Sequence, residues 1–144
     1  MKSMLAIILV SFLSVTPEWL TNMDEAKKIA GENNKLILLN FSGSDWCAPC
    51  IKMKKEVFLQ DAFLQYAEEH LILVRADFPR LKKNQLEAAQ VKHNEALAEQ
   101  YNPTGKFPYT LLLDANGKLI KAWDGYKTMA PEDFVKELSQ ASHD

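Results

Sequence analysis

The chain has only two cysteines, Cys47 and Cys50, and they are three positions apart. A cysteine reacts as its thiolate, and a second thiol within reach can close a disulfide with it. The pair lies in the segment Trp46-Cys47-Ala48-Pro49-Cys50. This spacing predicts a dithiol–disulfide exchange centre, with a Cys47–Cys50 disulfide in the oxidised protein.

Two flanking segments must position this pair. Residues 35–41 form a nearly continuous apolar run, which is typical of a strand covered on both faces of a sheet. The residues from about 49 to 58 have the apolar spacing of an amphipathic helix. Cys47 would then lie near the start of that helix, where free backbone N–H groups and the positive end of the helix dipole stabilise a thiolate.

The other segments alternate between helix and strand patterns. A first helix is expected from Asn22, which can cap it, to Asn33-Asn34, which can end it. A bend is expected near residues 60–61 and a helix end at His70, and a further helix is expected at least from residue 91 within the polar stretch 80–100. Strands are expected at 71–77, 109–113 and 119–123 with an Asn-Gly turn at 116–117, and a last helix begins at Pro131. This order predicts an α/β domain.

The composition and the N-terminus limit the function classes. With 144 residues, 47% apolar and 25% charged, the chain fits one globular domain, and a net charge of −2 without a long basic run argues against a nucleic-acid partner. Lys2 precedes a short apolar run, which is the pattern of a secretory signal peptide. We therefore expect residues 1–16 to be a signal peptide or an uncleaved membrane anchor, with a buried strand as the alternative. Residues 17–144 are expected to form the domain.

Other interpretations of the cysteines have less support. A structural disulfide at this spacing closes a very short loop and stabilises little. A zinc site needs about four ligands, and the only histidines that could complete it are His70, His93 and His143, which lie in surface, helix-end or tail positions. We therefore expect no metal and no cofactor.

At this point the residues resemble thioredoxin. The resemblance rests on the Trp-Cys-Ala-Pro-Cys segment between strand and helix, on Phe107-Pro108 before a strand, and on the Asn-Gly hairpin, and it covers about residues 20–141. It implies a thioredoxin-like α/β fold with a central mixed β-sheet flanked by helices. It also implies an exposed attacking Cys47, a buried resolving Cys50, and a cis Pro108 that lies against the pair. Trp46, Phe107 and Pro108 would then bind substrate.

The chain also departs from the thioredoxin pattern. Thioredoxin has a buried acid on the strand before the cysteines, and the nearest match here is Asn40, which cannot accept a proton. Asp45 is acidic but adjacent to the motif, and we expect it to be exposed and assign it no role. Neither Arg75 nor Asp77 can be placed from sequence. Phe107 is bulkier than the usual residue, and the segment 80–100 is an addition.

The resemblance implies a thiol–disulfide oxidoreductase that acts on protein disulfides. Ala48-Pro49 is similar to the pair found in reductants, so we expect a protein-disulfide reductase. It would act as a monomer, exported to the periplasm or anchored facing it, where a membrane electron donor would reduce it again. The alternatives are a chaperone-like substrate-binding module and a disulfide oxidase or isomerase. A peroxide-reducing enzyme lacks identifiable catalytic residues.

Overall fold

A mixed five-stranded sheet forms the centre of the molecule. The computed structural model describes residues 16–143. The sheet order is β1-β3-β2-β4-β5, in which β1, β3 and β2 are parallel and β4 and β5 are antiparallel to their neighbours. The strands are β1 (Trp19–Leu20), β2 (Leu36–Ser42), β3 (Leu71–Asp77), β4 (Tyr109–Leu113) and β5 (Leu119–Asp124). The expected mixed sheet is therefore confirmed.

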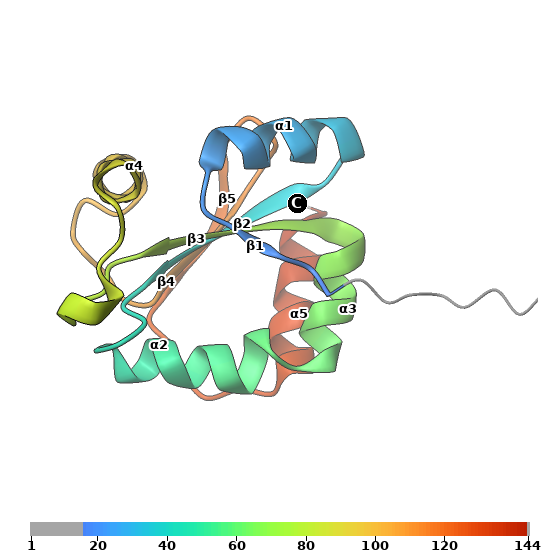
Figure 1. The fold of residues 1–144 in the computed structure, drawn as a ribbon. Helices are drawn as coiled ribbons and strands as arrows, with labels where there is room; N and C mark the ends of the chain where they lie inside the picture. Colours follow the sequence, from blue (N-terminus) through green and yellow to red (C-terminus); the bar gives the residue numbers. More distant parts are fainter. Residues whose placement is uncertain (1–15, 144) are drawn as a thin grey trace, which may run out of the picture.

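Helices cover both faces of this sheet. They are α1 (Met23–Asn33), α2 (Ala48–Met53), α3 (Asp61–His70), α4 (Ala88–Tyr101) and α5 (Pro131–Ala141). A π-helical turn, Lys54–Phe58, continues α2, and a 3-10 turn, Lys82–Asn84, precedes α4. In Figure 1, α1 and α4 lie above the sheet, and α2, α3 and α5 lie below it.

The alternation of side chains along β2 divides the core into two halves. Ile37, Leu39 and Phe41 are fully buried in the half that α1 and α4 cover, whereas Leu38 is buried in the half that contains α2, α3 and α5. Because side chains alternate along a strand, Asn40 lies on the same face as Leu38. The strand therefore places one buried polar side chain under α2.

Local signals account for where the helices begin and end. The Asn22 side chain accepts hydrogen bonds from the backbone amides of Asp24 and Glu25, as expected for a cap. Asn34 ends α1 with a left-handed backbone at φ 52°. Pro131 begins α5, as expected. The expected bend near residues 60–61 is the boundary between the π-helical turn and α3.

One strand was not predicted: β1, which has only two residues. α4 begins at Ala88 and contains the helix expected at least from residue 91. The N-terminal leader expected at 1–16 lies outside the described residues except for Thr16. Among residues 16–143, no helix has the length and apolar character needed to cross a membrane.

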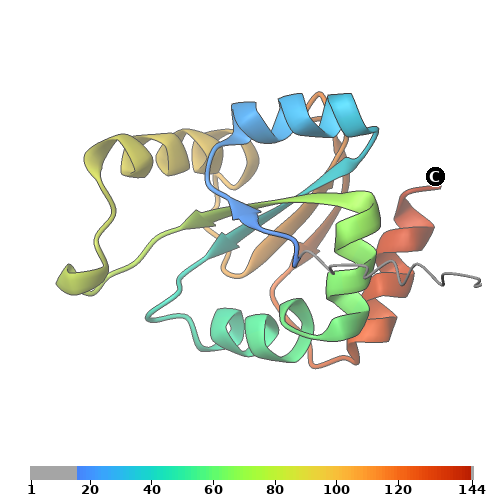
Figure 2. The same ribbon diagram turned by 45° about the vertical axis from the view of Figure 1, so that its right-hand side comes forward.

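The loops after β2 and β3 leave the same end of the sheet, because these two strands are parallel. Figure 2 shows both loops projecting from that end, one leading into α2 and the other toward α4. The loop after β3 therefore contacts the loop that carries the cysteine pair.

Candidate active site

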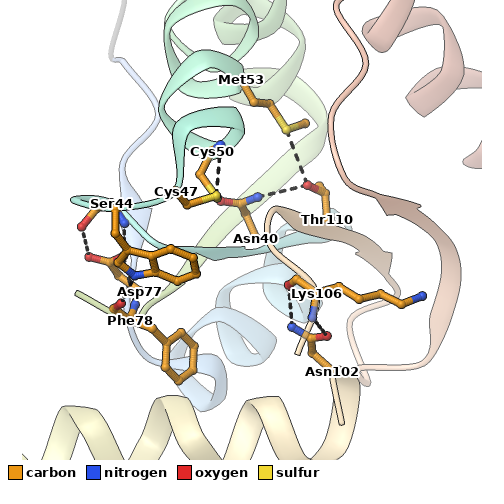
Figure 3. The surroundings of a disulfide bond; sticks show 11 residues. Asn40, Ser44, Cys47, Cys50, Met53, Asp77, Phe78, Asn102, Lys106 and Thr110 are labelled. Carbon is orange, nitrogen blue, oxygen red and sulfur yellow. Dashed lines mark hydrogen bonds between the residues drawn. A yellow bond between two sulfur atoms is a disulfide. The ribbon is translucent and has the colours of Figure 1, made fainter. Parts of the chain in front are cut away.

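Cys47 and Cys50 are joined by a disulfide at the start of α2. The S–S distance is 2.09 Å and the Cα atoms are 5.2 Å apart. Cys47 is the N-cap residue of α2, and its Sγ accepts a 3.3 Å hydrogen bond from the backbone N–H of Cys50 (Figure 3). The sulfur therefore lies where helix N–H groups would stabilise a thiolate after reduction.

The expectation of an exposed Cys47 and a buried Cys50 is wrong for this oxidised state. Both residues are 4% exposed. The physical reason is that the Cys47 sulfur is bonded to Cys50 at the start of α2 and also accepts the Cys50 amide, so it faces the helix. Ala48 and Pro49 between them are exposed, so the surface at the pair is formed mainly by these two residues.

Three buried side chains, joined by hydrogen bonds, lie beneath the disulfide. The Asn40 side-chain N–H donates a 3.0 Å hydrogen bond to the Thr110 hydroxyl oxygen, and that hydroxyl lies 3.9 Å from the Met53 sulfur, which it can donate to. In Figure 3 the Asn40 side chain rises from β2 toward the cysteine pair. No acid occupies this position, in agreement with the sequence.

Of the three residues expected to bind substrate, Trp46 and Phe107 are partly exposed and contact each other, whereas Pro108 is buried. The Phe107–Pro108 peptide bond is cis, the isomer that the resemblance implies. The rings of Trp46 and Phe107 meet edge to face with their centroids 5.3 Å apart, and Phe107 meets Phe78 in the same way at 5.5 Å. Trp46, Phe107 and Phe78 therefore form an aromatic cluster next to Cys47.

Hydrogen bonds fix the two ends of this cluster. The Trp46 indole N–H donates a 2.7 Å bond to the carbonyl of Phe78. Before Phe107, the buried Asn102 side chain accepts from the Lys106 amide at 2.8 Å and donates to the Lys106 carbonyl at 2.9 Å. Gly43 allows the indole to approach, since a Cβ there would lie 2.3 Å from the Trp46 ring.

Two aspartates fasten the loop after β3 to the cysteine loop. The Asp77 carboxylate accepts hydrogen bonds from the backbone amide and the hydroxyl of Ser44. The Asp45 carboxylate accepts from the amides of Arg80 and Leu81, both at 2.9 Å. Hydrogen bonds, chiefly the one from the Arg80 amide, hold the pKa of Asp45 below its ordinary value of 3.8.

The contacts of these two aspartates could not be predicted from sequence, which assigns Asp45 no role and does not place Asp77. Each carboxylate instead bonds backbone groups that are 33 to 36 positions away, and no local pattern signals a contact of that kind. The unexplained segment 80–100 begins with the loop that Asp45 holds.

Two of the histidines make contacts with residues other than the cysteines. His93 on α4 accepts a 3.2 Å hydrogen bond from the Met23 amide at the start of α1. His70 packs against Tyr66 at the end of α3. Within residues 16–143, no three histidine, cysteine, aspartate or glutamate side chains gather as a metal site would require.

Comparison with known proteins agrees with this geometry. A family model described as a thioredoxin-like domain matches residues 23–142. The chain belongs to the thioredoxin-like domain family. The family assignment covers the disulfide, the aromatic cluster and the loop fastened by Asp45.

The chain is similar to proteins that are named as enzymes of disulfide chemistry. DsbH of Chlamydia pneumoniae, described as a disulfide bond reductase, is 40% identical over 117 residues, which are 81% of this chain and 68% of the relative. A solved structure of a DsbH oxidoreductase superposes with a TM-score of 0.80 at 30% identity, and covers 97% of this chain and 94% of that one.

A more distant structure shares the fold alone. The oxidised C-terminal domain of Neisseria meningitidis DsbD has a TM-score of 0.59 at 18% identity, with 82% of this chain and 90% of that chain covered. A Cys-x-x-Cys pair at a strand–helix junction, within this family and fold, makes the protein a thiol–disulfide oxidoreductase.

Proposed function

We propose that this protein is a protein-disulfide reductase in which Cys47 attacks and Cys50 resolves. The observation that carries the assignment of roles is the position of the Cys47 sulfur at the N-cap of α2, where it accepts the Cys50 amide. A thiolate formed there gains the same hydrogen bond with a full charge, and charge-assisted hydrogen bonds are the stronger kind.

The reaction transfers two electrons to the substrate. The Cys47 thiolate attacks one sulfur of a substrate disulfide, the substrate S–S bond breaks, and a mixed disulfide and a substrate thiolate form. Cys50 gives its proton to that thiolate or to water and attacks the Cys47 sulfur. The Cys47–Cys50 disulfide closes, the second substrate thiolate leaves and takes up a proton, and the protein ends in its oxidised form.

Substrate polypeptide would bind beside the pair. Trp46 directly precedes Cys47, and its ring and that of Phe107 form a partly exposed aromatic surface that suits an extended chain, while the buried, cis Pro108 would turn the Phe107 backbone toward that chain. The name of the Chlamydia relative as a disulfide bond reductase supports the direction of the reaction. Ala48-Pro49 between the cysteines supports it as well, since the intervening residues help to set the potential.

The N-terminal sequence supports a proposal for the compartment in which the protein acts. Residues 1–16 would direct export or anchor the protein, and residues 17–144 would work as a monomeric domain in the periplasm. An oxidising compartment returns dithiols to disulfides, so a reductant there needs a donor of two electrons. A membrane electron carrier of the Dsb type is the partner that we propose.

A measured reduction potential tests the direction. We expect a value nearer to the thioredoxin figure of about −270 mV than to the figure of about −120 mV for a strong oxidant. The protein should also reduce insulin when it is supplied with a dithiol. A potential above about −150 mV would instead support a disulfide oxidase.

The binding-module alternative is tested by removing both thiols. A Cys47→Ser, Cys50→Ser double variant should lose all turnover with insulin. If that variant still suppresses aggregation of reduced insulin as well as the unchanged protein does, and the unchanged protein shows no catalytic reduction, the chaperone-like function is supported instead.

A further inference from the structure

An open groove lies beside the disulfide, on the side of the loop after β3. It has a volume of about 640 Å³ and is lined by Trp46, Phe78, Pro79, Arg80, Gly105 and Phe107. Two of these residues, Trp46 and Phe107, directly precede Cys47 and Pro108. A polypeptide whose disulfide meets Cys47 would therefore place its neighbouring residues in or near this groove.

Arg80 is the charged residue of this lining, and its guanidinium lies over an aromatic ring. The Arg80 guanidinium carbon lies 3.6 Å from the centroid of the Trp46 ring, a cation–π arrangement. Among residues 16–143, no carboxylate lies within 4.0 Å of this guanidinium. Its five N–H donors can therefore bond a group supplied from outside.

The backbone under this side chain is held in place. The Arg80 amide donates to Asp45 at 2.9 Å, and the next amide, of Leu81, donates to the same carboxylate. The Asn84 side chain adds a third bond to Asp45 at 3.0 Å. Stacking on Trp46 then limits the rotation of the guanidinium, so less freedom is lost when it binds a ligand.

The surroundings of the groove are basic. Lys82 and Lys83 follow Arg80 in the exposed 3-10 turn, and in the described part of the chain neither has a carboxylate within 4.0 Å. The acid nearest to Arg80 in sequence, Asp77, accepts hydrogen bonds from Ser44 and from the Phe78 amide, and Asp45 accepts from backbone amides, so neither is within ion-pair distance of these basic side chains. Arg80 is therefore a cationic side chain in the groove lining that has no carboxylate partner within the described residues.

We propose that Arg80 is a specificity-determining residue that binds an acidic side chain next to the disulfide of the substrate. The guanidinium forms two parallel hydrogen bonds with an aspartate or glutamate carboxylate, the geometry for which arginine is suited. Apolar neighbours of that acid pack on Trp46 and Phe107. This inference rests on the proposed function, because it assumes that a disulfide substrate occupies the groove.

Matched disulfide peptides test this inference. Two peptides are made that differ only in having glutamate or glutamine next to the cysteine, and a third has the glutamate moved ten residues away. The reduced protein, in excess, is mixed with each peptide at low ionic strength, and the rate constant for a single turnover is measured. The readout is the rate constant for a glutamate peptide divided by that for the glutamine peptide, both measured with the same protein. A general loss of activity in a variant lowers both rate constants and cancels in this ratio.

The unchanged protein should reduce the adjacent-glutamate peptide about three- to fivefold faster than the glutamine peptide, the size expected for a partly exposed charge pair. The displaced glutamate should give a ratio near one. Arg80→Gln should bring the adjacent-glutamate ratio to about one, and Arg80→Glu should reverse the preference. Lys28→Gln, an equal charge change at an exposed position of α1, should keep the preference of the unchanged protein.

The outcomes separate this inference from the function on which it rests. If all peptides are reduced at equal rates, or if the preference survives in Arg80→Gln, the role of Arg80 is wrong and the reductase remains. If the displaced glutamate gives the same advantage, general attraction of charge explains it and the inference is again overturned. If the reduced protein reduces no peptide, the proposed function itself fails.

Discussion

Asn40 donates a 3.0 Å hydrogen bond to the hydroxyl of Thr110, and both side chains are buried under the cysteine pair. Asn40 is the nearest match in sequence to the buried acid of thioredoxin, but an amide cannot take a proton from Cys50. Removal of that proton then depends on water or on the departing substrate thiolate. The two residues are direct cross-strand partners, so the position is held by the sheet itself.

Asn40→Asp should raise the rate of disulfide reduction at neutral pH. General-base assistance is worth roughly 10²–10⁴-fold in favourable cases, so even part of this effect would be measurable. A buried carboxylate that is incompletely paired should lower stability by about 1–3 kcal/mol, although Thr110 can turn its hydroxyl to donate to it. Insulin reduction against pH and urea unfolding measure the two effects.

The control for this change is Asn33→Asp, which makes the same substitution on the exposed end of α1. It should alter neither the rate nor its pH dependence. An unchanged rate in a folded Asn40→Asp protein would mean that this position does not exchange protons with Cys50.

Cys47 should be the thiol that reacts first in the reduced protein. Its sulfur lies at the N-cap of α2, where backbone N–H groups favour the thiolate. Limiting iodoacetamide followed by peptide mapping should find most of the label on Cys47. Preferential labelling of Cys50 would reverse the assignment of roles.

Cys50→Ser should accumulate mixed disulfides with substrate proteins, and Cys47→Ser should not. The resolving step needs the second thiol, so its removal leaves the substrate bound through Cys47. Non-reducing gels after capture from cells compare the two variants. Equal trapping by both would contradict an ordered mechanism with two distinct thiols.

Asp45→Ala should loosen the loop after β3 without unfolding the protein. The amides of Arg80 and Leu81 lose their shared acceptor, so their hydrogen exchange should accelerate about tenfold, as for the loss of a capping side chain. Asp24→Ala, a charge change on exposed α1, is the control and should leave exchange at these amides as it was. Similar exchange in both variants would mean that the carboxylate does not hold the loop.

The same contact should depend on pH. Hydrogen bonds, chiefly the one from the Arg80 amide, lower the pKa of Asp45 below 3.8 in the folded protein. The ionised carboxylate therefore contributes its full stabilisation of the fold above the pKa of an unfolded aspartate, about 3.9, and loses it as the pH falls through the lower pKa of the folded state. The NMR shifts of the Arg80 and Leu81 amides should therefore titrate with a midpoint below pH 3.8. A midpoint above that value would contradict the assigned bonds.

Gly43→Ala should displace the Trp46 indole. The added Cβ would lie 2.3 Å from the ring, which is much closer than carbon atoms approach, so the ring must move and its bond to Phe78 must lengthen or break. Overpacking of this kind lowers stability by about 1–3 kcal/mol. Faster exchange of the Trp46 indole N–H, seen by NMR, and slower insulin reduction should accompany it.

Gly31→Ala provides the comparison for that variant, because nothing lies within 4 Å of a Cβ at Gly31 and the residue is in α1. Gly31→Ala should leave the NMR shift and the exchange rate of the Trp46 indole N–H unchanged. An unmoved indole signal in Gly43→Ala would show that the ring is held less closely than the structure indicates.

Much of the fold could be predicted because its signals are local. The apolar runs that become β2 and β3, the cap at Asn22 and the proline that begins α5 each depend on a few consecutive residues. The cysteine pair and the helix start at Cys47 were likewise predictable. β1 was missed because two residues carry no periodicity, and it forms only by pairing with β3.

The surroundings of the site were less predictable, because they depend on contacts between distant segments. Nothing near Asp45 in sequence indicates that Arg80, Leu81 and Asn84 will bond to it. Those contacts follow from the parallel pairing of β2 and β3, which brings two loops to one end of the sheet. Nor does the residue type of Cys47 indicate that it will be buried in the oxidised state, where its sulfur is bonded to Cys50 and accepts the Cys50 amide.

The fastening of the loop after β3 has a consequence for engineering by loop exchange. Residues 77–84 can be transplanted between relatives only together with residues 44 and 45, because Ser44 donates to Asp77 and Asp45 accepts from the amides of Arg80 and Leu81. A chimaera that receives the segment alone, in a host without these residues, would leave the amides at positions 80 and 81 without their acceptor. Substrate preference and the shape of the redox centre would then change together, and a library that varies this loop should vary residues 44 and 45 as one unit with it.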